Sequence, residues 1–209
     1  MLRKTVRFMC VLLTTLSLGF ALTGAAADFD KAYNAYDKGD YKIALDEWRV
    51  LANQGDAESQ QYLAIMHFFG KGVPQDSTKA AQWFRRAAEQ GNANAQLKLG
   101  ILYSLGKGVP QDPTKTAQWY RRAAEQGEVN AQYHLGLMYN KGTGVTRNPV
   151  MAYVVSNLAA AQGNKKAREI RDIIAKTLSR EQIAEGQRMA SEWRVGTPLP
   201  YFKDFKTWP

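Results

Sequence analysis

Two segments of the chain are almost identical: GKGVPQDSTKAAQWFRRAAEQGNANAQ (70–96) and, 36 residues later, GKGVPQDPTKTAQWYRRAAEQGEVNAQ (106–132), which share 22 of 27 positions. A catalytic site needs its residues once, at one point in space, whereas self-similarity at a fixed period is typical of repeat architectures. The period extends further, because single glycines recur at 55, 91, 127 and 163, and glycine pairs at 70/72, 106/108 and 142/144. The chain is therefore predicted to be an array of similar units.

Each unit is predicted to be a helical hairpin. Between the glycines lie two stretches of about a dozen residues with apolar side chains at helical spacing. Asp76 and Asp112 stand where a second helix begins, and Pro113 follows at the first helical position, where its missing N–H is not needed. Gly91 and Gly127 suit the left-handed turn that ends a helix. Alanines at 87, 88, 123 and 124 let helices approach, and Trp83 and Trp119 are interpreted as core residues.

The repeat carries the pattern Ala95-x3-Leu99-Gly100-x2-Tyr103-x2-Gly106-x-Gly108-Val109-x2-Asp112-x2-Lys115-x-Ala117-x-Trp119-x3-Ala123-Ala124-x-Gln126-Gly127. It resembles the Sel1-like repeat, a longer relative of the tetratricopeptide repeat. Three copies are visible, at 57–91, 93–127 and 129–163. The third has Asn148 in place of Asp and Val155 in place of Trp. Such a departure fits a repeat next to the end of the array.

The flanking segments are interpreted as caps. Residues 28–55 resemble a tetratricopeptide-type hairpin, with Ala44 and Trp48 in the places of Ala80 and Phe84. Residues 164–194 have helical spacing, and Ser179 with Gln182 matches a capping box. The tail 195–209, with its prolines and aromatics, is predicted either to dock on the last hairpin or to meet a partner. The predicted fold is therefore all-α: an α/α solenoid of about five helical hairpins, in which neighbouring units bury each other's apolar faces.

The N-terminus, residues 1–27, matches a secretory signal peptide. A basic start, MLRKTVR, precedes an apolar run and the small residues Ala25-Ala26-Ala27. Removal of this segment would leave no cysteine, because Cys10 is the only one, and 25 Lys and Arg against 19 Asp and Glu. We therefore expect an exported protein, periplasmic or extracellular, with no membrane anchor after cleavage. Its basic charge favours an acidic protein or an anionic cell-surface polymer over nucleic acid.

Candidate catalytic motifs are few. His67 and His134 are the only histidines, and no metal-binding spacing occurs, so no metal or other cofactor is expected. Ser104-x-x-Lys107 matches a motif of penicillin-binding proteins, but the partner motifs S-D-N and K-T-G are missing. The β-lactam activity of cysteine-rich Sel1-like relatives is not carried over, because their paired cysteines are absent. The arginine pairs 85–86 and 121–122 are interpreted as solvated, with Arg85 and Arg121 pairing with Glu89 and Glu125.

The first helices of the three repeats, 61–69, 97–105 and 133–141, differ most at positions that share one helical face. The resemblance to tetratricopeptide-like arrays implies that first helices line the inside of the superhelix. A partner without a 36-residue period requires such differences, so we predict a concave binding groove with Lys98 and His134 as polar anchors. Its predicted residues are Tyr62, Ile65, Phe68, Phe69, Leu97, Lys98, Ile101, Leu105, Tyr133, His134 and Leu137.

Two functions follow from these patterns. The first is a non-catalytic, monomeric scaffold or adaptor of the cell envelope that binds a protein or peptide, as the resemblance to Sel1-like proteins implies. The alternative is a wall-directed enzyme or accessory acting on peptidoglycan or β-lactams, which export, basic charge and Ser104-x-x-Lys107 would favour. Turnover of a chromogenic β-lactam that depends on Ser104 would separate them.

Overall fold

The computed structural model describes residues 27–200, and the predicted signal peptide therefore lies almost wholly outside the described part of the chain. Those residues form ten α-helices and no strand, which confirms the predicted all-α solenoid. None of these helices is long and apolar enough to span a membrane. The helices are α1 (Phe29–Lys38), α2 (Tyr41–Asn53), α3 (Ala57–Phe69), α4 (Ser77–Glu89), α5 (Ala93–Leu105), α6 (Pro113–Glu125), α7 (Val129–Lys141), α8 (Pro149–Ala161), α9 (Lys165–Ala175) and α10 (Arg180–Glu192).

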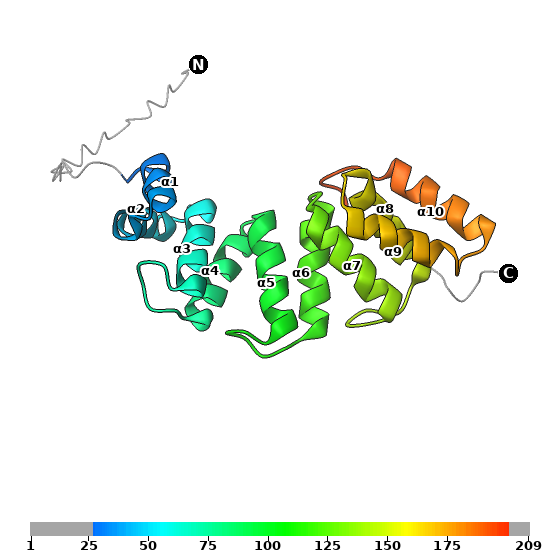
Figure 1. Ribbon diagram of the computed structural model, residues 1–209, viewed down its shortest axis with the longest axis horizontal. Helices are drawn as coiled ribbons and strands as arrows, with labels where there is room; N and C mark the ends of the chain where they lie inside the picture. The colour runs from blue at the N-terminus through cyan, green and yellow to red at the C-terminus, as the bar shows by residue number, and fades with distance from the viewer. Residues whose placement is uncertain (1–26, 201–209) are drawn as a thin grey trace, which may run out of the picture.

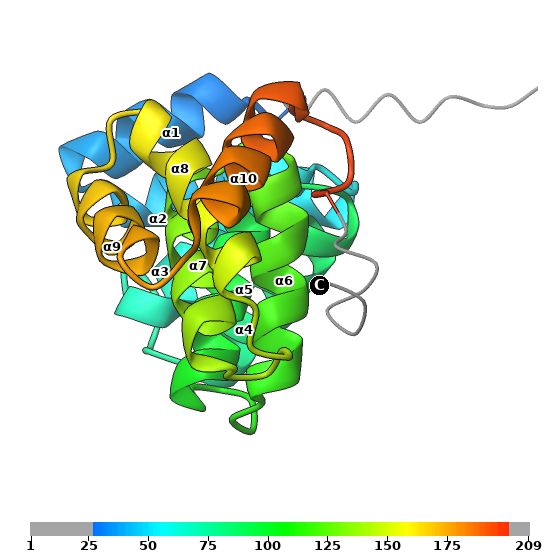
Figure 2. The same cartoon turned by 90° about the vertical axis from the view of Figure 1, so that its right-hand side faces the viewer.

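The helices follow one another along the long axis of the molecule as antiparallel pairs (Figure 1). From α1 to α9 each helix packs against the next one in the chain. The regular order ends at α10, which packs on α8 rather than extending the row (Figure 2). The array is therefore a solenoid in which every hairpin is stabilised mainly by its neighbours.

Polar caps fix where the second helices begin. The carboxylates of Asp76 and Asp112 accept hydrogen bonds from the backbone N–H groups of Lys79 and Lys115, both at 2.9 Å. Asn148 makes the same bond in the third repeat, so its departure from Asp preserves the cap. These predicted helix starts are confirmed. Each cap satisfies one of the N–H groups that the first turn of a helix leaves without a partner.

The second glycine of each pair allows a loop to lie against the hairpin before it. Gly72, Gly108 and Gly144 have φ of 69°, 71° and 67°, in the left-handed region. A Cβ on Gly108 would lie 2.0 Å from the carbonyl oxygen of Ser77, and one on Gly144 would lie 2.1 Å from that of Pro113. No side chain fits at such distances, so both the backbone conformation and the close approach require glycine.

The core runs along the array and is rich in alanine, which lets the helices approach closely. Ala80, Ala87 and Ala88 of α4 are buried, as are Ala123 and Ala124 of α6. A side chain on Gly100 would collide with the Tyr120 ring, so α5 and α6 also meet at a glycine. Close backbone approach thus replaces large side chains in much of the core.

Trp83 and Trp119, the tryptophans of the first two repeats, lie at the joints between hairpins and are only half-buried. Trp83 packs against the clusters on both sides of it, which agrees with the core interpretation. The fully buried aromatic positions are the next residues, Phe84 and Tyr120. The guanidinium of Arg86 lies over the Trp83 ring at 4.5 Å, so the outer face of the indole is covered by a cation.

The interpretation of Arg85 and Arg121 as partners of Glu89 and Glu125 is wrong. Arg85 Nη2 donates to the Tyr103 hydroxyl at 2.7 Å, and Arg121 donates to the hydroxyl of Tyr139. Both bonds join a second helix to the first helix of the next repeat. Helical spacing placed these pairs within reach, but the neighbouring hairpin offers a tyrosine acceptor that the spacing does not reveal.

A ladder of buried glutamines also joins the hairpins. Gln60, Gln96 and Gln132 each donate from Nε2 to a carbonyl oxygen of the preceding hairpin, at 3.0 to 3.2 Å. Each also accepts, through Oε1, a bond from the glutamine at the end of its own second helix, at 2.8 to 3.0 Å. Each of these carbonyls also accepts from the N–H of the glycine that follows its helix, so the ladder adds a second hydrogen bond at each helix end and links consecutive hairpins.

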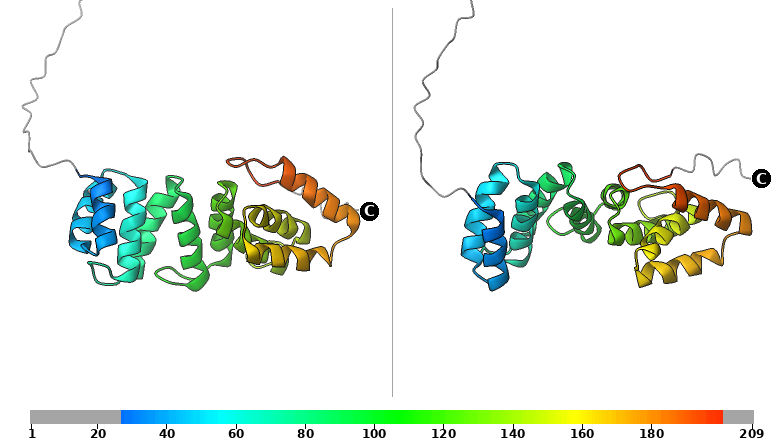
Figure 3. Two further views of the ribbon diagram at one scale, coloured as in Figure 1. Left: turned by 45° about the horizontal axis from the view of Figure 1, so that its top comes forward. Right: turned by 90° about the horizontal axis from the view of Figure 1, so that it is seen from above.

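The C-terminal segment contains the predicted capping box, and the start of the tail docks on the solenoid. Ser179 and Gln182 form the predicted capping box at the start of α10. After α10 the chain turns back toward α6 (Figure 3), where the N–H of Gly196 donates to the Glu125 carbonyl at 2.8 Å. The N–H of Leu199 donates to the Glu125 carboxylate at 3.0 Å, and its side chain is buried. The start of the tail therefore docks on the second repeat; residues 201–209 lie outside the described part.

Candidate partner-binding surface

The repeat-variable face of the first helices forms two pockets, one on each side of α5. The first, here called the apolar pocket, has a volume of about 170 Å³ and lies between the α3–α4 hairpin and α5. Its wall is almost wholly apolar, with Lys98 as the one charged side chain. The lining residues are Ile65, Phe68, Phe69, Phe84, Lys98, Ile101 and Leu102.

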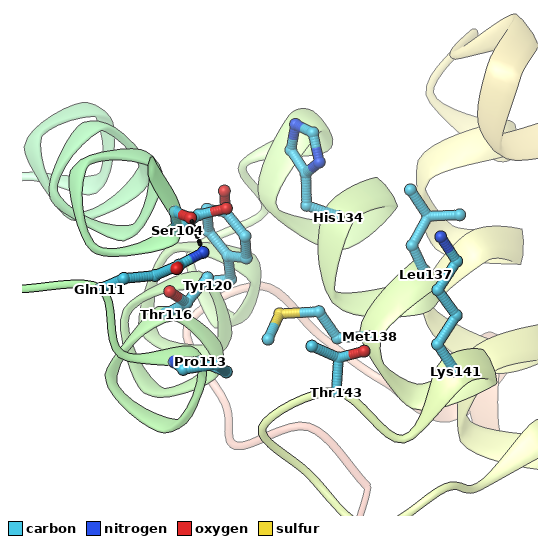
Figure 4. Close-up of a pocket in the computed structure, with 10 residues that line it drawn as sticks. All are labelled: Ser104, Gln111, Pro113, Thr116, Tyr120, His134, Leu137, Met138, Lys141 and Thr143. Carbon is cyan, nitrogen blue, oxygen red and sulfur yellow. Dashed lines mark hydrogen bonds between the residues drawn. The ribbon is translucent and has the colours of Figure 1, made fainter. Parts of the chain in front are cut away.

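The second, here called the polar pocket, has a volume of about 240 Å³ and lies between the α5–α6 hairpin and α7. Residues of α5, α6 and their loop face residues of α7 and the following loop across it (Figure 4). Hydroxyl, amide, imidazole and ammonium groups line it beside a few apolar side chains. The lining residues are Ser104, Gln111, Pro113, Thr116, Tyr120, His134, Leu137, Met138, Lys141 and Thr143.

Seven of the eleven predicted groove residues line these pockets: Ile65, Phe68, Phe69, Lys98, Ile101, His134 and Leu137. Phe69 is 63% exposed, a large exposed fraction for a phenylalanine. Leu105, at the equivalent position of α5, is 57% exposed but lines neither pocket. Single exposed apolar residues are ordinary, whereas a cluster of them beside a hollow is typical of contact sites.

The other three predicted residues are packing residues. Leu97 is only 5% exposed and belongs to the core that α6 and α7 share, so it cannot contact a partner. Tyr62 stacks on Trp48 at 4.4 Å within the aromatic cluster of the N-terminal hairpin. Tyr133 packs against the small cluster formed by Ala159, Ala160 and Ala167. Leu97 is therefore not available to a partner, whereas Tyr62 and Tyr133 are half-buried and also contact neighbouring hairpins.

The polar pocket contains residues that the first helices alone did not predict. Thr116 and Tyr120 belong to the second helix, while Gln111 and Thr143 belong to loops. Lys141 occupies the position that Phe69 and Leu105 hold in the other repeats. This variation among repeats is the sequence signal that could have identified Lys141 as a pocket residue. The loop residues are placed by folding, since the Gln111 amide donates to the Ser104 carbonyl at 2.8 Å.

His134 and Tyr120 stack in this pocket with ring centroids 5.2 Å apart. Burial lowers the pKa of His134, because the imidazolium loses hydration; nearby Lys166 also lowers it, while Glu128 opposes the shift. Burial raises the pKa of Tyr120 to about 12. Both rings are therefore neutral at pH 7, and Lys141 is the one charged side chain that lines the pocket.

Ser104 and Lys107 have a poor geometry for catalysis. Ser104 is the penultimate residue of α5, where the negative end of the helix dipole opposes formation of an alkoxide. The ammonium of Lys107 lies over the Phe68 ring, 5.8 Å from its centroid. Within residues 27–200, no group of three or more His, Cys, Asp or Glu side chains could hold a metal ion.

The fold and this surface define an α-solenoid built from tetratricopeptide-like hairpins. The family model of the Sel1 repeat matches residues 57–92, 93–128 and 129–164, more than half of the sequence. The chain belongs to the Sel1 repeat family. Repeats of this kind commonly mediate protein–protein interactions, and Sel1 repeat proteins are generally non-catalytic scaffolds.

Solved structures of Sel1-type proteins share the fold. A Sel1 repeat protein from Oxalobacter formigenes matches with a TM-score of 0.70 and 25% identity, over 79% of this chain and 70% of that one. The protein c5321, described as a protective antigen of uropathogenic Escherichia coli, matches with a TM-score of 0.56 and 29% identity, over 79% of this chain and 44% of its own.

The Helicobacter pylori cysteine rich protein B also matches, with a TM-score of 0.51 and 24% identity, over 63% of this chain and 94% of its own. This likeness concerns the fold alone. No match was found among curated proteins.

Proposed function

We propose that the protein is a non-catalytic, monomeric scaffold of the cell envelope that binds a protein or peptide partner through the concave face of the solenoid. The observation that carries the proposal is the pair of pockets on either side of α5. Both include residues that differ from repeat to repeat, such as Lys98 and Lys141, whereas the helix caps and the glutamine ladder are repeated. Repeated residues hold the array together, so variable ones are available for recognition.

The pockets suit side chains of a polypeptide better than a small rigid ligand. Together they lie along three consecutive first helices, α3, α5 and α7. A partner segment laid across α5 would place an apolar side chain in the apolar pocket and polar groups in the other. Apolar anchors in pockets usually contribute most of the affinity of such a contact.

The predicted export supports an envelope location, because residues 1–27 match a signal peptide. The alternative, a wall-directed enzyme, is weakened by the position of Ser104 at the negative end of α5. Turnover of a chromogenic β-lactam that Ser104→Ala abolishes would overturn the scaffold proposal.

The test is capture of envelope proteins by crosslinking to the full-length chain. Replacing Phe69 and Leu137 by serine removes one apolar side chain from each pocket. We expect this variant to keep its helical content and to lose most of the captured partner.

The matched control replaces Ile43 and Val50 by serine. These residues are 45% and 46% exposed on α2, in the N-terminal hairpin. The control should capture the partner as the wild type does. Equal loss in both variants would mean that capture depends on general surface hydrophobicity rather than on the pockets.

A further inference from the structure

The cations of the three repeats divide into two groups. Residues 57–164 contain eleven lysines and arginines. Nine of them have a partner on the protein, as a hydrogen bond, an ion pair or an aromatic ring: Lys71, Lys79, Arg85, Arg86, Lys107, Lys115, Arg121, Arg122 and Arg147. Lys98 and Lys141 alone have none among the residues that the structure describes.

These two unpaired lysines line the two pockets. Lys98 belongs to the apolar pocket and Lys141 to the polar pocket. Both are exposed, and both occupy positions where the other repeats carry different residues. Nine of the eleven cations have a partner on the protein, whereas the two that have none line the pockets of the proposed binding face.

No acidic side chain lines either pocket. The repeats contain six acids, and four of them have contacts of their own. Asp76 and Asp112 cap second helices and pair with Lys79 and Lys115, while Glu125 holds the C-terminal segment. Glu128, whose charge acts on His134, caps α7 by accepting from the N–H of Ala131. The charge of the pocket lining itself is therefore positive, which favours an anionic ligand group.

We propose that the partner segment is acidic and apolar together: an apolar side chain fills the apolar pocket, and Asp or Glu side chains close to it pair with Lys98 and Lys141. This inference rests on the proposed function. The two pockets lie on either side of α5, so an extended segment that crosses this helix meets both. Such a segment would carry an apolar residue and at least one acid close to it in sequence.

A polyanionic polymer fits less well. Its repeating charges could pair with the lysines, but it has no side chain for a pocket walled by Ile65, Phe68 and Ile101. A C-terminal carboxylate also fits less well. The two lysines belong to pockets on opposite sides of α5, so a segment that reaches both continues past at least one of them. Both remain outcomes of the test.

The experiment selects a displayed library of random dodecapeptides on the immobilised full-length protein. We expect enriched peptides to combine an apolar residue with Asp or Glu at internal positions. One enriched peptide is then synthesised with its acids and with the corresponding amides. Binding of the acidic form should weaken about ten-fold in the Lys98→Gln/Lys141→Gln variant, which should bind the amide form as the wild type does.

The control variant, Lys42→Gln/Lys176→Gln, removes the same charge from exposed positions outside the repeats and should leave the acidic peptide unaffected. Enriched peptides that need Phe69 and Leu137 but carry no acid preference would overturn this inference and leave the proposed function standing. Enriched peptides that bind only through a free C-terminus, or poly-L-glutamate binding as tightly as the peptide, would also overturn it. If none of the pocket variants weakens binding of the enriched peptides, both proposals are overturned.

Discussion

Helices α4 and α8 hold the same position in their repeats, yet they are buried differently. In α4 five residues are buried, four of them alanine, and the rest of the helix surface is largely polar. In α8 nine residues are buried, and valines or methionine stand where α4 has Thr78, Lys79 and Gln82. The second helix of a repeat therefore presents a polar face to solvent within the array and buries an apolar face at the end of the array.

The reason for the difference is α10. It packs on α8, and Tyr153 and Val154 lie against Gly186, where a side chain on α10 would collide with the Tyr153 ring. No helix lies on the corresponding face of α4. In the ordinary repeat this face is polar and stays in contact with solvent. The last repeat carries apolar residues there, and α10 covers them as the cap of the array.

The largest expected effect comes from removing that cap. Deletion of residues 165–209 would expose Val150, Met151 and Val154, each of which contributes about 1.5 to 3 kcal/mol when buried. Because this is comparable to the whole stability of a typical domain, we expect a large fall in the thermal midpoint and aggregation. Circular dichroism and light scattering measure both. A deletion of 201–209 alone is the control, and an equally stable, monomeric 1–164 fragment would show that α9 and α10 are not a cap.

Exchanging valine and glutamine at equivalent positions of two second helices measures how much the buried face of α8 contributes to stability. Val154→Gln buries an amide between α8 and α10 and should lower the free energy of unfolding by about 2 to 4 kcal/mol. Gln118→Val makes the reverse change on α6, where the side chain is exposed, and should alter it by less than about 0.5 kcal/mol. Urea unfolding of both variants measures the difference. Equal effects would show that burial of this face does not distinguish the two helices.

The glutamine ladder is common to the middle and the end of the array, so substitutions in it should have similar effects in both regions. Gln96→Leu would remove one of the two hydrogen bonds to the Ala88 carbonyl, which still accepts from the N–H of Gly91, and would remove the acceptor of the Gln126 Nε2 group. It should cost about 0.5 to 1.5 kcal/mol. Gln132→Leu breaks the same bonds next to α8 and should cost a similar amount. Unfolding by urea is again the measurement. A neutral result at either position would mean that water satisfies these groups and that the ladder is not a source of stability.

The smallest expected effect is the pH dependence that His134 adds to α7, where α5 has Lys98. Burial lowers its pKa, so between that value and about 6.5 the unfolded chain binds the proton more readily than the folded one. Stability should therefore fall as the pH drops below about 6.5. His134→Gln should reduce the difference between the thermal midpoints at pH 7.5 and 5.5, with the remainder due to His67, whose pKa burial also lowers. An unchanged difference would contradict this.

Much of the fold could be predicted because its signals are local. The period of 36, the Asp caps and the glycines at helix ends depend on residues close in sequence, and each lies where expected. Arg85 was assigned the wrong partner because its acceptor, Tyr103, belongs to the next hairpin. Leu97 was assigned to the groove for the same reason: its position on the variable face was predicted correctly, but α6 and α7 cover it.

The sequence by itself determined the unit, its length and its ends, because helix caps, glycine turns and apolar spacing act within one hairpin. It also indicated which first-helix positions differ, and most of these line a pocket. Only the tertiary structure decided which variable residues are accessible, how α10 turns back onto α8, and that Leu199 docks on the second repeat. These outcomes depend on how neighbouring hairpins pack, and packing is decided by contacts between residues that the chain keeps far apart.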